Sequence, residues 1–389
     1  MNIKLTRVSI ITFSFFLISL FTLVRLSNAN YNASFFIVAG SDFVDSNLTL
    51  TPILVQKGQG YDGQFFYKYA VNPFNFDKFK YGVDVDLPSY RMQRIGYPLF
   101  VWLIALGNSN LVPFSLIITN VLAFIGIIFF SIKIVTHYKV NLTYSLIPLL
   151  FCGLYMSLAR NLSEVFELFC FSGCIYYFVV KKPINFCLFT SITLLTRETS
   201  IIAIAPLIFF SILSVFKNKD NLINILFYTI PIAIMLSWKM IIQLNVPNSE
   251  ITGGYHHLGF PFYGIINGFI LNCNFYSTKH ILEFLFWVLY LIWHISFTAV
   301  IVKLLVKNCT LNEILQNPLA IIYFVWLIFA ILFTEIIYID DWGFMRIFSL
   351  WNFVGFIILV QQKYKLNKPF VLFSVFSVFL TLVRLSIRV

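Results

Sequence analysis

Long apolar segments recur along almost the whole chain, and they constrain the fold more than any other feature of the sequence. A straight helix needs about 20 mainly apolar residues to cross a bilayer, and we count about eleven segments of that length or close to it. Their cores are 8–25, 111–135, 142–158, 164–180, 183–195, 201–216, 221–244, 281–303, 318–338, 347–361 and 369–383. The sequence therefore predicts an all-α, polytopic transmembrane protein with a single integral membrane domain over residues 1–389.

The composition agrees with residence in a lipid bilayer. The chain is 59% hydrophobic and 11% charged, whereas a soluble domain is about half apolar and about a quarter charged. The net charge of +11 does not indicate a nucleic-acid partner, because no basic run of the kind that grips a phosphate backbone is present. The short apolar stretch 97–107 is expected to lie in the membrane interface or to re-enter.

The lysines between the apolar segments predict a topology. If the segment before residue 8 is cytoplasmic and forms the start of an uncleaved first helix, every alternate loop is basic, as the positive-inside rule requires. The segments on the other side are 26–96, 159–163, 196–200, 245–280 and 339–346. Two of them, 26–96 and 245–280, are long. The end of the chain disagrees with this topology, because Arg384 and Arg388 would fall outside.

Cysteine and histidine spacing gives no sign of a metal centre. The six cysteines are scattered without zinc spacing, so we predict no disulfide and no structural metal. His256 and His257 are adjacent but lack further ligands at suitable spacing. The neighbouring Asp340 and Asp341 suit either a divalent cation or a solvated loop. We expect no cofactor.

The first long loop carries an acid between glycines. Tyr61, Asp62 and Gln64 lie in the run Tyr-Asp-Gly-Gln, and the flanking glycines allow a ligand to approach closely. A carboxylate at such a point can take a proton from an attacking hydroxyl. Asp42 or Asp45 is a candidate second acid. Alternatively, Asp62 caps the helix that begins near Gln64.

Two arginines follow at the point where the chain is expected to enter the membrane. Arg91 and Arg94 lie three residues apart, so on a helix they point the same way and form a candidate phosphate clamp. The alternative is that they anchor the chain among lipid headgroups.

Further charged pairs occur at the same predicted side. Arg160 precedes Glu164 by four residues and is its candidate partner, and Glu167 shares the face of Glu164. Arg197 and Glu198 interrupt two apolar segments. For Arg160 and Glu164 the alternative to a ligand site is a structural ion pair, and for Arg197 and Glu198 it is a simple hairpin turn.

These residues form a constellation on one side of the predicted topology. Carboxylates and guanidiniums together suit an anionic donor and a hydroxyl acceptor, and we expect Arg91, Arg94 and Arg197 to line one cavity with Asp62. Arg346, in the last of these loops, belongs to the same set. The two long loops are expected to cover the cavity.

Three segments resemble the multi-pass C-type glycosyltransferases, the GT-C superfamily, and most closely the bacterial members linked to cell-surface glycopolymers. They are GYDGQFFYKYAVNPF (60–74), YRMQRIGYPL (90–99) and LTRETS (195–200). The resemblance implies a GT-C fold with a large first extracytoplasmic loop. It also implies that Asp62 is the catalytic base and that the arginines hold a lipid phosphate.

The sequence therefore predicts a glycosyltransferase in the bacterial inner membrane. Its donor is a polyprenyl-phosphate-linked sugar, and its acceptor is a hydroxyl of a glycan, lipid or protein on the extracytoplasmic face. The candidate substrate-binding residues are Tyr61, Gln64, Arg91, Arg94, Arg160, Glu164, Arg197, Glu198 and Arg346. A transporter or flippase, in which the charges bind substrate during alternating access, is the main alternative. A non-catalytic scaffold is a third.

Overall fold

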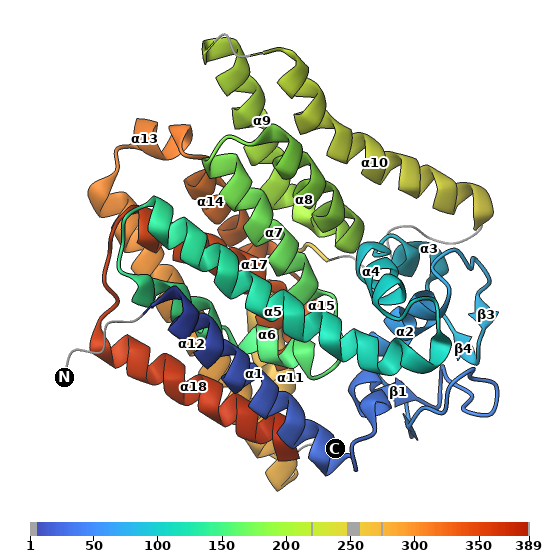
Figure 1. The fold of residues 1–389 in the computed structure, drawn as a ribbon. Helices are drawn as coiled ribbons and strands as arrows, with labels where there is room; N and C mark the ends of the chain where they lie inside the picture. Colours follow the sequence, from blue (N-terminus) through green and yellow to red (C-terminus); the bar gives the residue numbers. More distant parts are fainter. Residues whose placement is uncertain (1–5, 219–220, 247–256, 274, 388–389) are drawn as a thin grey trace.

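The computed structural model describes residues 6–218, 221–246, 257–273 and 275–387, and these residues are mainly helical (Figure 1). The α-helices are α1 Arg7–Asn28, α2 Gly63–Val71, α3 Pro88–Met92, α4 Gly96–Ile104, α5 Val112–His137, α6 Cys152–Leu158, α7 Glu164–Val179, α8 Pro183–Thr196, α9 Ile201–Asn218, α10 Ile223–Asn245, α11 Tyr263–Asn272, α12 Thr278–Asn308, α13 Leu311–Gln316, α14 Pro318–Leu332, α15 Glu335–Tyr338, α16 Asp341–Ile347, α17 Ser349–Gln361 and α18 Lys368–Ile387. The 3-10 helices are η1 Ala33–Ile37, η2 Ser109–Leu111, η3 Leu142–Leu150 and η4 Glu198–Ser200. The all-α prediction holds apart from two small sheets.

Both sheets lie in the first long loop. Strands β1 (Ala39–Gly40) and β2 (Val55–Gln56) pair in parallel, with Ala39 opposite Val55. Strands β3 (Phe79–Lys80) and β4 (Val83–Asp84) form an antiparallel hairpin. Together with η1, α2 and α3, these strands fold residues 29–92 into a layer at one end of the helical body, on the right in Figure 1. We call this the Asp62 end.

Local sequence sets where several helices begin. Thr6 and Ser9 form a capping box at the start of α1, which satisfies backbone donors that the first turn leaves open. Pro183 and Pro318 occupy the first turn of α8 and α14, where proline costs no hydrogen bond.

Glycines let the central helices approach one another closely. Helix α7 packs against α5 and α8. A Cβ added at Gly126 of α5 would lie 2.3 Å from the ring of Phe169, and one at Gly173 of α7 would lie 2.3 Å from the ring of Phe189. Small residues at such interfaces are typical of membrane helices, whose association depends on close packing.

Within the described part of the chain, six helices are long and apolar enough to cross a membrane, and the total is seven if the pair α16 and α17, bent by 44°, counts as one span. These helices make the chain a multi-pass membrane protein. Many large apolar side chains face outward on them, for example Leu226, Leu236 and Met240 on α10. Lipid tails cover such surfaces without cost.

The remaining predicted spans are shorter or broken. Every one of the eleven apolar segments contains helix, but the count of eleven crossings stays a prediction. Segment 142–158 is not one continuous helix: it divides into η3 and α6 at Phe151, which has an extended backbone. Pro148, inside η3, removes a backbone donor and helps to break the run. Most of stretch 97–107 lies in α4, which has nine residues and ends at Ile104.

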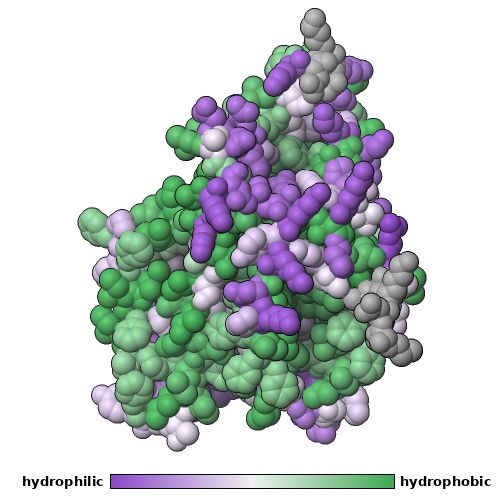
Figure 2. Space-filling model, turned by 90° about the vertical axis from the view of Figure 1, so that its left-hand side faces the viewer, coloured by the Kyte–Doolittle hydropathy of each residue, from purple (hydrophilic) through white to green (hydrophobic). Residues whose placement is uncertain are grey.

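The loops predicted to be basic meet at the opposite end of the molecule. His137, Lys181, Asn317 and Gln361 line one cavity of about 430 Å³ there, and we call this the Lys181 end. The face on that side of the molecule carries hydrophilic side chains in a band bordered by hydrophobic ones (Figure 2). The two predicted groups of loops are thus separated in space.

Helices α1 and α18 lie side by side and run in the same direction (Figure 1). Near its end, α1 is tied to the end of α18, because Arg25 Nη1 donates to the carbonyl of Leu385. Arg384, which runs against the positive-inside pattern, forms an ion pair with Asp341 at the Asp62 end, so its charge is balanced there. Arg388 lies outside the described residues.

Candidate functional site

A cavity of about 1020 Å³ opens at the Asp62 end. Its walls come from the loop before α2, from α3, from the α8–α9 junction, from α10, and from the region between α14 and α17. Eight of the ten residues singled out from the sequence line it: Tyr61, Asp62, Gln64, Arg91, Arg94, Arg197, Glu198 and Arg346. The expected group of Arg91, Arg94 and Arg197 with Asp62 is therefore present in one cavity.

Asp62 lies between two guanidiniums. Its Oδ1 accepts a hydrogen bond from Arg91 Nη1 at 2.9 Å, and its Oδ2 accepts one from Arg346 Nη1 at 3.2 Å. The Asp62 side chain makes no capping hydrogen bond to α2, so the capping alternative is wrong. Both carboxylate oxygens are turned instead toward the charged cavity.

The charge state of Asp62 follows from these contacts. Burial alone raises the pKa of a carboxyl group. At Asp62 the guanidiniums of Arg91, Arg346 and Arg94 outweigh burial, and the net effect is a pKa well below the usual range for aspartate. Asp62 is therefore a carboxylate at neutral pH.

Gly63 fixes the position of Asp62. A Cβ added at Gly63 would lie 2.5 Å from the carbonyl oxygens of Arg160 and of Ile37. Only a residue without a side chain allows α2 to begin this close to the α6–α7 link and to η1. The glycine after the acid is thus required by packing.

The two arginines near α3 have different carboxylate partners. Arg91 also binds Asp86, through Nη2 at 2.7 Å and Nε at 2.9 Å, and its guanidinium lies 4.5 Å from the ring centre of Phe65. Arg94 reaches Glu198 through Nη2 at 3.1 Å and Nε at 3.3 Å. Forked contacts of this kind hold a guanidinium in a defined plane.

A buried acid, Glu164, holds two of the arginines that line the cavity. Glu164 Oε1 accepts hydrogen bonds from Arg197 Nη1 at 2.5 Å and from Arg346 Nη1 at 3.2 Å. Glu167 lies 3.9 Å from Arg197. Arg346 Nη1 contacts both Asp62 and Glu164. One guanidinium therefore connects the buried Glu164 with Asp62.

One candidate pairing from the sequence is wrong. Arg160 does not pair with Glu164: its guanidinium lies 3.6 Å from the ring centre of Trp342 and 4.9 Å from that of Tyr61. Residues 160 and 164 are not on one helix, because Asn161 has a φ of 50° between α6 and α7. The spacing of four residues therefore does not bring their side chains together.

Arg197 and Glu198 are adjacent in the sequence, but each binds a residue far away in the sequence. Arg197 has an extended backbone, with φ −155° and ψ 117°. Successive side chains point in opposite directions along an extended backbone, so one residue of the pair faces Glu164 and the other faces Arg94.

The other candidate acids lie elsewhere. Asp42 and Asp45 are exposed and do not line the cavity. Asp340 Oδ1 accepts from the backbone of Trp342 and its Oδ2 accepts from the Tyr61 hydroxyl, whereas Asp341 binds Arg384. These two acids therefore have separate partners. His256 lies outside the described residues.

Gln64 has a structural task. Its Oε1 accepts from the backbone of Gly40 and its Nε2 donates to the carbonyl of Gln59. It joins the loop before α2 to β1, which holds the wall of the cavity in place.

Several lining residues were not recognised from the sequence as part of this site, notably Asp86, Tyr90, Lys239 and His257. The sequence did contain a signal for Lys239, because a lysine inside an apolar membrane segment is usually functional. Asp86 and Tyr90 had none, since their roles depend on the fold of the first loop. His257 and Leu258 line the cavity from the second long loop.

The cavity combines two chemical capacities. Five of its lining side chains are cationic, namely Arg91, Arg94, Arg197, Lys239 and Arg346, and three are carboxylates, Asp62, Asp86 and Glu198. Guanidiniums and an ammonium suit an anionic ligand, and a carboxylate suits a hydroxyl that must lose a proton. Among the described residues, no group of three or more histidine, cysteine, aspartate or glutamate side chains is placed to hold a metal ion.

No family model, curated protein or solved structure matches this chain.

Proposed function

We propose that the protein is a membrane glycosyltransferase of the GT-C type. It transfers a sugar from a polyprenyl-phosphate donor to a hydroxyl of a glycan, lipid or protein acceptor, on the extracytoplasmic face of a bacterial inner membrane. The observation that carries the proposal is the position of Asp62, which is held as a carboxylate between Arg91 and Arg346 in a cavity lined by further cations.

The surroundings of the cavity fit a lipid-linked donor. The cavity lies where the folded first loop meets helices that are long enough to cross a membrane. Its lining includes Trp326, Phe329 and Phe333 together with the guanidiniums. An apolar wall beside cations suits a molecule that has a hydrocarbon chain on one side of its phosphate and a sugar on the other.

Donor binding would activate the base. Before the donor binds, the guanidiniums stabilise the carboxylate of Asp62 and make it a weak base. A donor phosphate that takes hydrogen bonds from Arg91 and Arg346 competes with Asp62 for them. The Asp62 pKa then rises toward its ordinary range, and its ability to accept a proton increases.

The transfer itself is a displacement at the anomeric carbon. The acceptor hydroxyl forms the new glycosidic bond and gives its proton to Asp62, while the bond from the anomeric carbon to the phosphate oxygen breaks. The electron pair of that bond leaves with the polyprenyl phosphate, whose charge the guanidiniums stabilise. A single step of this kind inverts the anomeric centre.

The test is a transfer assay on the full chain, purified and reconstituted in liposomes. Radiolabelled polyprenyl-phosphate sugars are the donors, and a bacterial envelope glycan fraction is the acceptor. Label should enter the acceptor fraction. Asp62→Asn should lower the rate by about 10²–10⁴-fold, because asparagine cannot act as the base. Asp42→Asn, in an exposed position of the same loop, is the matched control and should leave the rate unchanged.

The same liposomes separate the transporter alternative from the enzyme. A transporter moves the intact donor across the bilayer and leaves the sugar–phosphate bond whole. If the label crosses without cleavage, and Asp62→Asn does not change the amount of cleaved donor, the glycosyltransferase proposal is rejected.

A further inference from the structure

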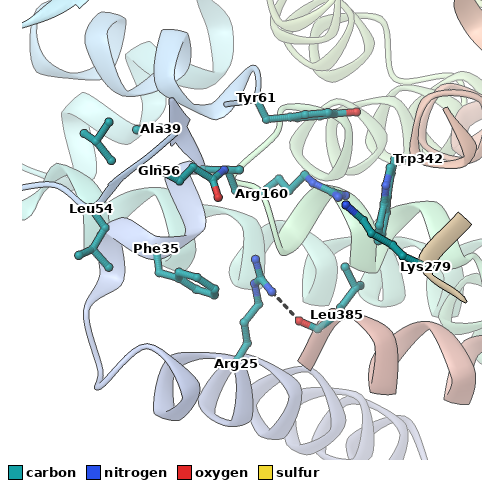
Figure 3. A pocket seen from close by; sticks show the side chains of 12 residues that line it. Arg25, Phe35, Ala39, Leu54, Gln56, Tyr61, Arg160, Lys279, Trp342 and Leu385 are labelled. Carbon is teal, nitrogen blue, oxygen red and sulfur yellow. Dashed lines mark hydrogen bonds between the residues drawn. The ribbon is translucent and has the colours of Figure 1, made fainter. Parts of the chain in front are cut away.

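A second cavity lies next to the first and shares Tyr61 with it. It measures about 520 Å³ and is formed where the ends of α1 and α18 meet the first loop, the α6–α7 link and the start of α12 (Figure 3). Its arginines contact the protein itself: Arg25 donates to the carbonyl of Leu385, and Arg160 lies against the ring of Trp342. This second cavity therefore belongs with the candidate site.

A third cavity lies at the Lys181 end, on the other side of the molecule. It measures about 430 Å³, which is within the range of small-molecule sites, roughly 300–1,000 Å³. The ends of α5, α7 and α17 and the starts of α8, α10 and α14 form its walls together with α9. No aspartate or glutamate is among the lining residues that the structure describes. The lining therefore favours a neutral or anionic ligand over a cation.

One wall of this cavity is an ordered set of polar groups. Gln361 Nε2 donates to the Tyr138 hydroxyl at 2.9 Å, and Asn317 Nδ2 donates to Gln361 Oε1 at 3.5 Å. Because the Tyr138 oxygen accepts in this contact, its own O–H can donate to a ligand. Asn317 is fixed in turn, since its Oδ1 accepts from the backbone of Leu319 at the start of α14. A phosphate or hydroxyl oxygen that enters the cavity therefore meets a donor that is already in position.

A lysine stands at the edge of the cavity in an unusual backbone conformation. Lys181 lines the cavity, is exposed and has a φ of 55°. It follows the last turn of α7, where its N–H donates to the carbonyl of Phe178 and the N–H of Lys182 donates to that of Tyr177. Many helices end in this way, and the left-handed residue is usually glycine. Lys181 therefore presents a charged side chain from a position where the backbone favours none.

Two neighbouring helices end with a lysine in the same conformation. Lys139, after α5, has a φ of 55°, and Lys363, after α17, has a φ of 51°. Each lies two positions after a residue that lines the cavity, namely His137 and Gln361. A lysine beyond the last turn also interacts favourably with the helix dipole. That effect is common to all three lysines, whereas Lys181 is the one of the three that lines the cavity.

The cavity borders helices that face lipid. Phe210 and Val215 of α9 line it, while Leu213 and Phe216 of the same helix are exposed. Both α9 and α10 are long and apolar enough to cross a membrane. Lipid tails would cover the outer surface of α9 within one helical turn of the cavity lining. These surroundings suit a ligand that joins an anionic group to hydrocarbon chains.

We propose that this cavity binds the headgroup of an anionic phospholipid in the leaflet at the Lys181 end. The phosphate would bind Lys181 and the O–H of Tyr138, and the rest of the headgroup would reach the amides of Asn317 and Gln361. The acyl chains would lie along α9 and α10. The site does not depend on the proposed sugar transfer, because it lies at the opposite end of the molecule from the candidate site.

Native mass spectrometry of the full chain in detergent tests the inference, since each bound lipid is counted by its mass. Phosphatidylglycerol is the anionic probe, and phosphatidylcholine with the same acyl chains is the zwitterionic probe. One phosphatidylglycerol per chain should bind in preference to phosphatidylcholine. Lys181→Gln should weaken this binding by about 5-fold, because a lysine near an anionic headgroup is lost. Lys139→Gln, at the same backbone conformation but outside the cavity, is the matched control and should bind as the wild type does.

Tyr138→Phe and a soluble probe sharpen the test. The variant removes one donor and keeps the ring, so it should weaken the binding of phosphatidylglycerol by about 3-fold. Glycerol phosphate carries a phosphate without acyl chains and should bind more weakly than the lipid. If it binds as tightly, the lipid proposal is overturned and the cavity is assigned to a soluble anion.

Preferential binding of phosphatidylglycerol that falls in Lys181→Gln and not in Lys139→Gln supports the inference. Equal binding by these two variants, or equal binding of the two lipids by the wild type, overturns it. Asp62→Asn separates this outcome from the proposed function, since Asp62 does not line this cavity. The variant should lose transfer and still bind phosphatidylglycerol. A wild-type protein that binds the lipid but transfers no sugar would reject the glycosyltransferase proposal and leave the lipid site.

Discussion

The contacts of Asp62 determine how the proposed enzyme responds to acid. A carboxyl group with a lowered pKa stabilises the folded state above its unfolded pKa of about 3.9, and that stabilisation is lost as the pH falls through the folded pKa. The kcat/KM profile reports groups of the free enzyme. We therefore expect no acid limb from Asp62 between about pH 5 and pH 7, which a rate profile over that range would check.

A midpoint near pH 6 that belongs to Asp62 would contradict this expectation. It would mean that the guanidiniums of Arg91 and Arg346 do not balance the burial of the carboxyl group. The profile of Asp42→Asn provides the comparison, since this exposed residue lies outside the cavity.

Arg346 is expected to act on both Asp62 and the leaving phosphate. Arg346→Gln removes one of the charges that lower the Asp62 pKa, so the acid limb should move to higher pH, and kcat should fall by about 10-fold or more. Arg346→Lys keeps the charge but replaces the planar guanidinium whose Nη1 contacts both Asp62 and Glu164. Arg346→Lys should therefore return the acid limb close to its wild-type pH but recover less of the wild-type kcat. Equal pH profiles for wild type and Arg346→Gln would exclude this role.

At the scale of single elements, the start of α2 controls the geometry of the site. Gly63→Ala would place a Cβ 2.5 Å from two carbonyl oxygens, so α2 must shift away from the α6–α7 link. Overpacking of this kind typically costs about 1–3 kcal/mol. We expect a lower melting temperature and a loss of transfer, measured by thermal unfolding and the liposome assay.

Gly259→Ala is the control for that variant. The nearest atom to its added Cβ is a methyl group of Thr334 at 3.2 Å, which belongs to a side chain and not to the backbone. It should change the stability less than Gly63→Ala does. If the two variants are equally stable, the close packing at Gly63 does not limit the fold.

The sequence predicted the helical elements better than the contacts between them. Hydrophobic length is a local property, so each apolar segment contains helix. The partner of Glu164 is not local: the arginine four residues before it turns away after Asn161, and Arg197 and Arg346 arrive from distant elements. Residue types that suit an anionic site were visible in the sequence, but their pairing depends on how the helices pack.

Breaks inside apolar segments were the other difficulty. Segment 142–158 has the composition of a span, yet a 3-10 run and a short α-helix share it. Hydropathy measures the affinity of a segment for lipid and carries no information on where its backbone changes direction. Pro148 was the one local signal for this break.

At the scale of the whole molecule, the two ends differ in charge and in cavities. Helices α1 and α18 run in the same direction (Figure 1), so the chain between them crosses the membrane an odd number of times, and the whole chain does so as well. This agrees with an odd predicted count and with the charged site and the basic loops lying at opposite ends.

Labelling with a membrane-impermeant maleimide checks which end faces outward. Cys273 is exposed in the second long loop, and in a variant that retains only this cysteine it should react from outside intact cells. Lys181→Cys in a cysteine-free background should react only after the membrane is opened. The reverse pattern would overturn the predicted orientation.

Tyr61 has a consequence for the order of events in a catalytic cycle. Because it stands between two cavities of separate volume, donor and acceptor need not take turns in one space. The single displacement proposed above requires both to be bound at the same time before any bond breaks. Initial-rate lines measured at several acceptor concentrations should then intersect, and labelled polyprenyl phosphate should not exchange into the donor while the acceptor is absent.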